Sequence, residues 1–268
     1  MHILDEIVAN KRKEIEELKL LSDIERFEKE GFFWNEPNIS LVQNLSDNNS
    51  TGIIAEFKRK SPSRGWFKDK ELEIKNIAGS YNINGAAGIS VLTDEIYFGG
   101  SLDDLMQAKV ITDVPILRKD FMIDPWQVAE AKAFGADVIL LIAACLSKSE
   151  VKRMAAYAKS LGLEVLLEIH NEDELDHICT EVDIVGVNNR DLKTFKVDIN
   201  TSLKLINKIP TNKIVIAESG ISDAETIVTL KQAGFKGFLI GETFMKEADP
   251  AIAFAGFVKK LKAKVNEN

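Results

Sequence analysis

Charged and amide side chains stand at the ends of five of the short apolar runs in this sequence. They are Glu56 and Lys58, Lys119, Glu168, Asn188 and Arg190, and Glu218 and Ser219. Lysines and carboxylates are the usual proton donors and acceptors of general acid–base catalysis. Glu56 and Lys58 are two residues apart, as are Asn188 and Arg190, so each pair can point to one side of an extended chain. These residues therefore predict a catalytic site, provided that the runs end at one place.

The apolar runs recur along most of the chain and alternate with segments of helical periodicity. Eight runs rich in Ile, Val and Leu lie at 53–57, 89–93, 115–119, 138–143, 164–169, 183–187, 213–217 and 237–241. The intervening segments include 124–136, 147–162 and 222–234, and several begin with a capping Asp or Ser and end with Gly. Eight strand–helix units predict an α/β fold, a (β/α)8 TIM barrel.

A doubly wound sheet is the alternative fold for the same alternation. It would usually open with a glycine-rich phosphate turn after the first strand. The first run is instead followed by KRKSPSRG, which contains neither G-x-G-x-x-G nor a P-loop motif. The barrel is therefore the better prediction.

The N-terminal part of the chain precedes the first run. Apolar residues at helical spacing across 1–31 predict one or two amphipathic helices, and the polar stretch 42–52 (VQNLSDNNSTG) predicts a loop. We expect a single barrel domain over 1–268, of which 1–48 is an N-terminal helical extension.

The carboxyl ends of barrel strands meet at one mouth, where the polar strand ends would converge. Charged residues where strands emerge into solvent are ordinary, so one such residue indicates little. Their repetition favours a catalytic site, because clustered charges are costly unless they are paired or used. The loops after the last two runs, 218–222 (ESGIS) and 240–245 (IGETFM), carry glycines where a barrel commonly binds phosphate, although turn glycines are also common there.

Composition excludes several classes of protein. The 268 residues carry 34 Lys and Arg against 42 Asp and Glu, a net charge of −8, which argues against a nucleic-acid binder. The longest apolar run, 138–146, is too short for a transmembrane helix, and the N-terminus lacks the pattern of a secretory signal. We therefore expect a cytoplasmic protein with its two cysteines, Cys145 and Cys179, reduced.

Histidines and aromatic residues give weaker signals. His170 and His177 are seven residues apart in HNEDELDH, and we interpret them as exposed polar residues rather than metal ligands, so no metal is predicted. The aromatic candidates for the mouth are Trp66, Phe98, Phe121 and Trp126.

Seven ordered motifs resemble those of the indole-3-glycerol phosphate synthase family. They are IAEFKRKSPSRG (54–65), LTDEIYFGGS (92–101), PILRKDF (115–121), LLEIHNEDEL (166–175), GVNNRDL (186–192), AESGI (217–221) and LIGETFM (239–245). The resemblance implies a (β/α)8 barrel with an N-terminal extension. It also implies a lyase of tryptophan biosynthesis, which converts 1-(2-carboxyphenylamino)-1-deoxyribulose 5-phosphate to indole-3-glycerol phosphate, CO₂ and water.

The resemblance also implies roles for individual residues. Its catalytic residues would be Glu56, Lys58, Lys119, Glu168, Asn188 and Ser219. Its phosphate contacts would be Lys58, Arg190, Gly220, Gly241 and Glu242, the last through its backbone N–H with the carboxylate turned away. An apolar slot for the anthranilate ring would come from Pro62, Phe98, Phe121, Leu140, Leu192 and Ile240. No cofactor is implied, and the only partner expected is the small phosphosugar substrate, bound by a monomer.

Two other functions remain open from the sequence. A phosphoribosylanthranilate isomerase-like enzyme would be expected to carry a cysteine at the end of the first strand, where this chain has Glu56 and Lys58. A non-catalytic phosphosugar-binding barrel would keep the phosphate loops without needing Glu56, Lys119 and Glu168.

Overall fold

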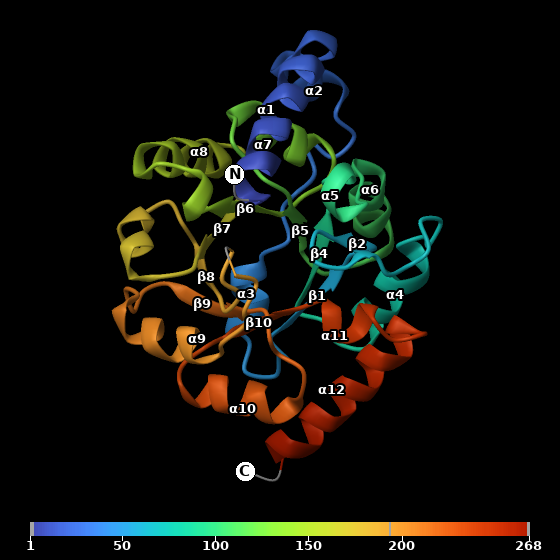
Figure 1. Cartoon of the computed structure of the whole chain (residues 1–268). Helices are drawn as coiled ribbons and strands as arrows, with labels where there is room; N and C mark the ends of the chain where they lie inside the picture. The colour runs from blue at the N-terminus through green and yellow to red at the C-terminus, as the bar shows by residue number, and fades with distance from the viewer. Residues whose placement is uncertain (1–2, 193, 267–268) are drawn as a thin grey trace.

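Eight parallel strands close into a barrel in the computed structural model, which describes residues 3–192 and 194–266 (Figure 1). The order around the barrel is β1-β10-β9-β8-β7-β6-β5-β4. These strands are β1 (Ile53–Phe57), β4 (Gly88–Leu92), β5 (Ile116–Lys119), β6 (Val138–Ile142), β7 (Glu164–Ile169), β8 (Ile184–Asn188), β9 (Ile214–Glu218) and β10 (Gly237–Ile240). Each predicted run became a strand, so the TIM-barrel prediction is confirmed.

Helices surround the strands and cover their outer face (Figure 1). The longer ones are α4 (Lys75–Ile83), α6 (Leu102–Ile111), α7 (Pro125–Ala133), α8 (Lys148–Ser160), α9 (Asn200–Leu205), α10 (Ala224–Gln232) and α12 (Pro250–Asn266). The shorter turns are α5 (Glu95–Phe98), α11 (Glu242–Met245), η1 (Ala143–Cys145), η2 (Glu172–His177) and η3 (Ile206–Lys208). Capping fixes where several of them begin: Ser147 and Glu150 form a capping box on α8, and Asp124 and Gln127 form one on α7. None of the described helices is long and apolar enough to span a membrane.

Alternation along each strand separates two apolar layers. Outward residues such as Ile139 and Leu141 of β6 pack beneath the surrounding helices, whereas Val138, Leu140 and Ile142 of the same strand face the barrel axis. The barrel interior is therefore a packed core, and only the residues nearest the carboxyl ends of the strands can form a site.

The N-terminal segment closes both ends of the barrel. Helix α1 (Ile3–Leu21) lies at the mouth, and α2 (Ile24–Glu30) packs against α7. Helix α3 (Leu41–Ser46) covers the opposite end, where Leu41 and Leu45 join the inward-facing core. Glu164, the first residue of β7, accepts hydrogen bonds from the backbone N–H groups of Leu41 and Val42 at 2.8 and 3.1 Å.

The prediction that 42–52 is a loop is therefore wrong for its first part. Ser40 caps α3 by accepting from the backbone N–H of Gln43, and Leu41 and Leu45 are one helical turn apart with their side chains buried. The surrounding Asn and Ser residues hide this pattern, because only those two positions have to be apolar. Residues 47–52 do form a loop.

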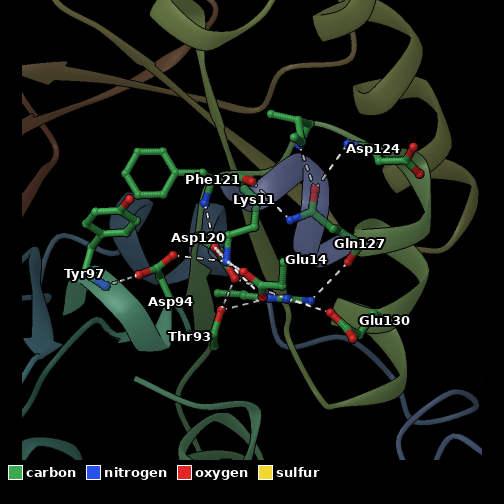
Figure 2. A network of polar contacts seen from close by, with 12 residues as sticks. Lys11, Glu14, Thr93, Asp94, Tyr97, Asp120, Phe121, Asp124, Gln127 and Glu130 are labelled. Atoms are coloured by element: carbon green, nitrogen blue, oxygen red, sulfur yellow. Dashed lines mark hydrogen bonds and ion pairs between the residues drawn. The ribbon is translucent and has the colours of Figure 1, made fainter. Parts of the chain in front are cut away.

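A buried ionic network fixes α1 to the barrel (Figure 2). The Lys11 side chain is 2% exposed, and its Nζ lies 3.1 Å from both Asp94 Oδ2 and Asp120 Oδ1. Asp120 also accepts from Thr93 Oγ1 at 2.6 Å and from Arg118 at 3.2 Å. Burial raises the pKa of Asp120, but Lys11 and Arg118 outweigh it and lower the pKa to about 2. The network therefore stays ionised and ties α1 to the ends of β4 and β5.

A two-stranded hairpin follows β1 and was not predicted. Strands β2 (Lys60–Ser61) and β3 (Gly65–Trp66) pair antiparallel within the loop that leads from β1 to α4. This hairpin carries Pro62 and Arg64 to the barrel mouth.

Candidate active site

A cavity of about 480 Å³ lies at the carboxyl ends of the barrel strands. Its lining contains nearly every residue that the sequence predicted for the site: Glu56, Lys58, Pro62, Phe98, Lys119, Phe121, Glu168, Asn188, Arg190, Leu192, Ser219, Gly220, Ile240, Gly241 and Glu242. Residues up to 186 positions apart in the sequence thus face one space, because the parallel strands bring their ends together.

Lys119, the last residue of β5, lies among three carboxylates. Its Nζ is 3.3 Å from Glu168 Oε2 and 3.8 Å from Glu218 Oε2. Burial lowers the pKa of Lys119, but the charges of Glu168, Glu218 and Glu56 outweigh it and raise the pKa above its ordinary value. Lys119 is therefore an ammonium that can donate a proton or a hydrogen bond.

Glu168, on β7, is held as a carboxylate by several donors. Its Oε1 accepts from Asn188 Nδ2 at 3.1 Å, and its Oε2 accepts from Lys119 at 3.3 Å. Burial raises the pKa of Glu168, yet Lys119, His170 and Asn188 together hold the pKa below its usual range. Glu168 is therefore suited to accept a proton.

Glu218, on β9, is in the opposite state. Burial and the nearby charge of Glu168 raise the pKa of Glu218, and Lys119 offsets only part of that effect. Its Oε1 is buried and has no hydrogen-bond partner among the described residues. Two neighbouring carboxyls with pKa values pushed apart are the arrangement that separates a proton donor from a proton acceptor.

A second lysine–carboxylate pair lies at the carboxyl end of β1. Lys58 Nζ donates to Glu56 Oε1 at 2.7 Å, and the two side chains thus lie on one side of the strand, as the two-residue spacing predicted. The Glu56 carboxylate lies over Gly241, where a Cβ atom would be 2.4 Å from Glu56 Oε1. Position 241 is thus glycine to make room for a carboxylate.

Basic side chains gather on the β8–β10 side of the cavity. Arg190 and Arg64 both contact the Glu242 carboxylate, at 3.4 and 2.8 Å. Glu242 therefore does not turn away, as the resemblance had implied, but occupies the space between two guanidinium groups. Lys246 also lines this side.

The turn after β9 has an unusual backbone beside these basic groups. Ser219 has φ of 66° and is followed by Gly220 with φ of 78°, so both are left-handed. For a residue other than glycine this conformation is strained and is found more often at functional sites. The Asn189 side chain stabilises the turn by donating to the carbonyl oxygens of Glu218 and Ser219 at 3.0 and 3.1 Å.

The β4–β6 side of the cavity is apolar. The Phe98 and Phe121 rings have centroids 6.0 Å apart. Ile142 and three residues of α1 (Ile3, Leu4 and Ile7) complete this wall. The strand order places this wall across the barrel from the basic side, with Glu56 of β1 and Glu168 of β7 on the two strands between them.

Comparison with known proteins gives the family. Residues 4–257 match the family model described as indole-3-glycerol phosphate synthase. A protein of that name from Bacteroides thetaiotaomicron is 47% identical, over 97% of this chain and 98% of its own length. Another from Dechloromonas aromatica is 40% identical, over 94% of this chain and 97% of its own. This chain belongs to the indole-3-glycerol phosphate synthase family.

Solved structures agree with the barrel of this synthase-family chain. A chain of the tryptophan synthase complex from Pyrococcus furiosus aligns with a TM-score of 0.59 over 79% of this chain and 97% of its own, at 16% identity. An N-acetylmannosamine-6-phosphate 2-epimerase from Clostridium perfringens gives a TM-score of 0.59 at 16% identity, over 76% and 90%. At such low identity these likenesses support the fold alone.

Three aromatic or aliphatic residues predicted for the cavity or its mouth lie elsewhere in the structure of this family member. Leu140 is 1% exposed and does not line the cavity, because it faces the axis one layer below the mouth, where Ile142 takes its place. Trp66 is exposed on the hairpin, with Lys60 and Lys70 over its ring. Trp126 packs against Phe27 of α2 at 5.1 Å between centroids, so neither tryptophan reaches the mouth.

Other residues of the synthase-family site received no individual role from the family resemblance. Glu218, like Glu168, lies at the end of a strand, and this position was the sequence evidence that it belongs to the site. The helical spacing of apolar residues predicted the apolar face of α1, but it did not predict that this face lines the cavity. His170, interpreted as exposed, is instead mostly buried behind Glu168.

Proposed function

We propose that this chain catalyses the conversion of 1-(2-carboxyphenylamino)-1-deoxyribulose 5-phosphate to indole-3-glycerol phosphate, CO₂ and water, the activity for which its relatives are named. One observation carries the proposal. The Lys119 ammonium lies between Glu168 and Glu218, in a cavity with an apolar wall on one side and arginines on the other. A substrate with an aromatic ring at one end and a phosphate at the other matches that polarity.

Ring closure is the first step, and we assign its acid to Lys119. The aromatic carbon that bears the carboxyl attacks the C2′ ketone, so the carbonyl oxygen gains negative charge and must take up a proton. An ammonium in a buried site can supply both the charge and the proton. Phe98 and Phe121 would hold the ring while the phosphate anchors the other end of the chain.

Loss of CO₂ then restores the aromatic ring, and dehydration completes the indole. Dehydration needs one group to remove a proton from carbon and another to protonate the departing hydroxyl. Glu168, ionised by its donors, is suited to the first role, and a protonated acid is suited to the second. Glu218, Lys119 and Lys58 all line the cavity and are the candidates for that acid. Asn188 would hold Glu168 in position, and Ser219 would help to bind the substrate.

Phosphate binding requires a rearrangement of side chains. We assign the phosphate to Arg190, Lys58 and the backbone of Gly220 and Gly241. Because the Glu242 carboxylate pairs with Arg190 and Arg64, it would have to move aside when a second anion arrives. Charge-assisted hydrogen bonds from arginine to phosphate would replace this ion pair.

We also propose that the chain is a single-domain monomer in the cytoplasm. Every residue assigned to the site comes from one chain, and both cysteines are free, as in a reducing compartment. A single sedimenting species of about 30 kDa would support the monomer.

The test of the activity is direct. Purified protein is mixed with the carboxyphenylamino-deoxyribulose phosphate, and indole fluorescence is followed together with CO₂ release. Production of both supports the proposal. Thermal stabilisation by the substrate without fluorescence would indicate a binding barrel, and turnover of phosphoribosylanthranilate instead would indicate the isomerase.

A further inference from the structure

His170 lies directly behind the carboxylate proposed as the base. It follows β7 two residues after Glu168, and its side chain is 8% exposed. Its Nε2 is 3.1 Å from Glu168 Oε1, which is ion-pair distance without hydrogen-bond geometry, and the same oxygen accepts from Asn188. The ring does not line the cavity, so it meets Glu168 from the side away from the substrate.

The other ring nitrogen faces a second carboxylate. Nδ1 is 3.2 Å from Glu174 Oε2, and the same oxygen accepts from the His170 backbone N–H at 2.8 Å. Glu174 Oε1 accepts from Asn171 at 2.9 Å, so the η2 segment is folded back to present this carboxylate to the ring. His170 is therefore placed between two acids, one at the site and one behind it.

The groups around the ring set its charge. On the site side, Lys119 of β5 and Asn188 of β8 reach Glu168, and Glu218 of β9 stands beyond. Segment η1 packs against β7 and η2 and carries Cys145. The Cys145 thiol adds no charge, because burial and the charges of Glu168 and Glu174 raise its pKa to about 12. Lys148 of α8 pairs with Asp176 at the outer surface of η2. Two carboxylates thus face the imidazole directly.

These surroundings favour a charged ring. Burial lowers the pKa of His170, but contacts with Glu168 and Glu174 outweigh it and raise the pKa to about 10. A neutral imidazole could still donate to Glu174 through Nδ1, but it would offer no positive charge to the Glu168 carboxylate 3.1 Å from Nε2.

We propose that His170 is a positioning residue for the synthase reaction: as an imidazolium locked by Glu174, it keeps Glu168 ionised and oriented as the base. This inference rests on the proposed function, since it gives a role to the environment of Glu168. It also accounts for the difference between Glu168 and Glu218, because only Glu168 has a cation on both sides.

The first experiment is a set of pH profiles of kcat at saturating substrate. In His170→Gln the loss of the cation raises the pKa of Glu168, so the acid limb moves to higher pH by about one unit. Below that limb kcat falls about tenfold, while the plateau at higher pH changes less than about threefold. Glu174→Gln keeps the acceptor for the backbone N–H and should give a smaller shift in the same direction.

The matched control is His177→Gln. His177 lies in η2 as well, but within the described residues its ring nitrogens form hydrogen bonds with the carbonyl oxygens of Glu174 and Leu146, both at 3.1 Å, and not with a carboxylate. The acid limb of the kcat profile of His177→Gln should stay at the pH of the wild-type limb. An unchanged limb in a folded His170→Gln variant, or an equal shift in His177→Gln, overturns the proposal.

A second measurement needs neither a variant at position 170 nor turnover. The ¹⁵N chemical shifts of the histidine rings in the wild-type protein report their protonation, and loss of one signal in His177→Gln assists assignment. We expect the His170 ring to be doubly protonated at pH 7.5. A ring that is neutral at that pH overturns the inference even if the synthase activity holds, whereas a charged ring in a protein without turnover would refute the proposed function alone.

Discussion

The Glu218 carboxylate occupies the space that a side chain at position 186 would need. A Cβ atom on Gly186 would lie 2.2 Å from Glu218 Oε1, closer than any such contact in proteins. Glu56 has the same relationship with Gly241, which follows β10. Glycines on β8 and after β10 therefore create the room for two buried carboxylates, and this room lets Glu218 lie near Glu168 with Lys119 shared between them.

Glu218→Gln should separate the acid role from the fold. The amide has the same shape and removes only the proton that Glu218 exchanges, so we expect kcat to fall by about 10²- to 10⁴-fold with an unchanged circular dichroism spectrum. Because the pKa of Glu218 is raised to about 8, a group that works protonated is active below that pH and loses activity above it. The wild-type kcat should therefore decline as pH rises through about 8.

The variant supplies the contrast in that pH profile. With glutamine at 218 the residual rate should not decline near pH 8. If kcat declines equally near pH 8 in the wild-type protein and in Glu218→Gln, the group that titrates there is not Glu218.

Lys119→Ala should abolish turnover with the fold intact. Removing the ammonium leaves no proton donor between Glu168 and Glu218, and we expect kcat to drop by at least about 10³-fold. Single-turnover indole fluorescence measures the loss, and a thermal unfolding scan checks the fold. Lys148→Ala, which removes an exposed lysine paired with Asp176, is the control and should keep full activity. Near-normal kcat in folded Lys119→Ala would remove Lys119 from the mechanism.

Arg190→Ala should weaken substrate binding more than chemistry. A charge-assisted hydrogen bond to phosphate contributes about 1.5–3 kcal/mol, so KM should rise by about 10- to 100-fold while kcat changes little. Initial rates over a wide substrate range give both constants. An unchanged KM would show that the phosphate lies elsewhere.

Glu242→Gln should have the opposite effect on KM. The Glu242 carboxylate competes with the incoming phosphate for Arg190 and Arg64, so neutralising it should lower KM by about three- to tenfold and tighten the binding of inorganic phosphate. Calorimetric titration with phosphate, at low salt because exposed ion pairs are screened, measures the change. Weaker phosphate binding in the variant would mean that Glu242 holds the arginines in place for the substrate.

The sequence predicted the barrel and the side chains at its strand ends because both follow from local patterns. Alternation of apolar runs and helices predicts a parallel sheet, and eight such units without a glycine-rich phosphate turn favour a barrel, whose strand ends then bring their polar residues together. Leu140 and Ile142 show the limit of this logic. Both face the axis, and which of them reaches the cavity depends on the stagger of β6 against its neighbours, which no local pattern reveals.

His170 and α3 were misjudged for a related reason. The residues around His170 are acidic and polar, which is typical of an exposed loop, yet Glu174 turns that segment back onto β7. The Asn- and Ser-rich segment after Ser40 similarly conceals two leucines that cover the end of the barrel. His170 is buried by a turn of its own loop, and Leu41 and Leu45 are buried by strands distant in the sequence. Composition reveals neither partner, so it predicts an exposed environment for both segments.

Lys11→Met should destabilise the protein and open the site at once. Lys11 is buried against Asp94 and Asp120, and removing one partner of a buried pair leaves uncompensated charge, which costs about 3–5 kcal/mol of unfolding free energy. Since α1 supplies Ile3, Leu4 and Ile7 to the cavity, KM should also rise. Lys19→Met removes the half-exposed pair with Asp124 on the same helix and should cost less than about 1 kcal/mol. Urea denaturation of both variants gives the comparison, and equal losses would show that the buried network adds nothing beyond an ordinary surface pair.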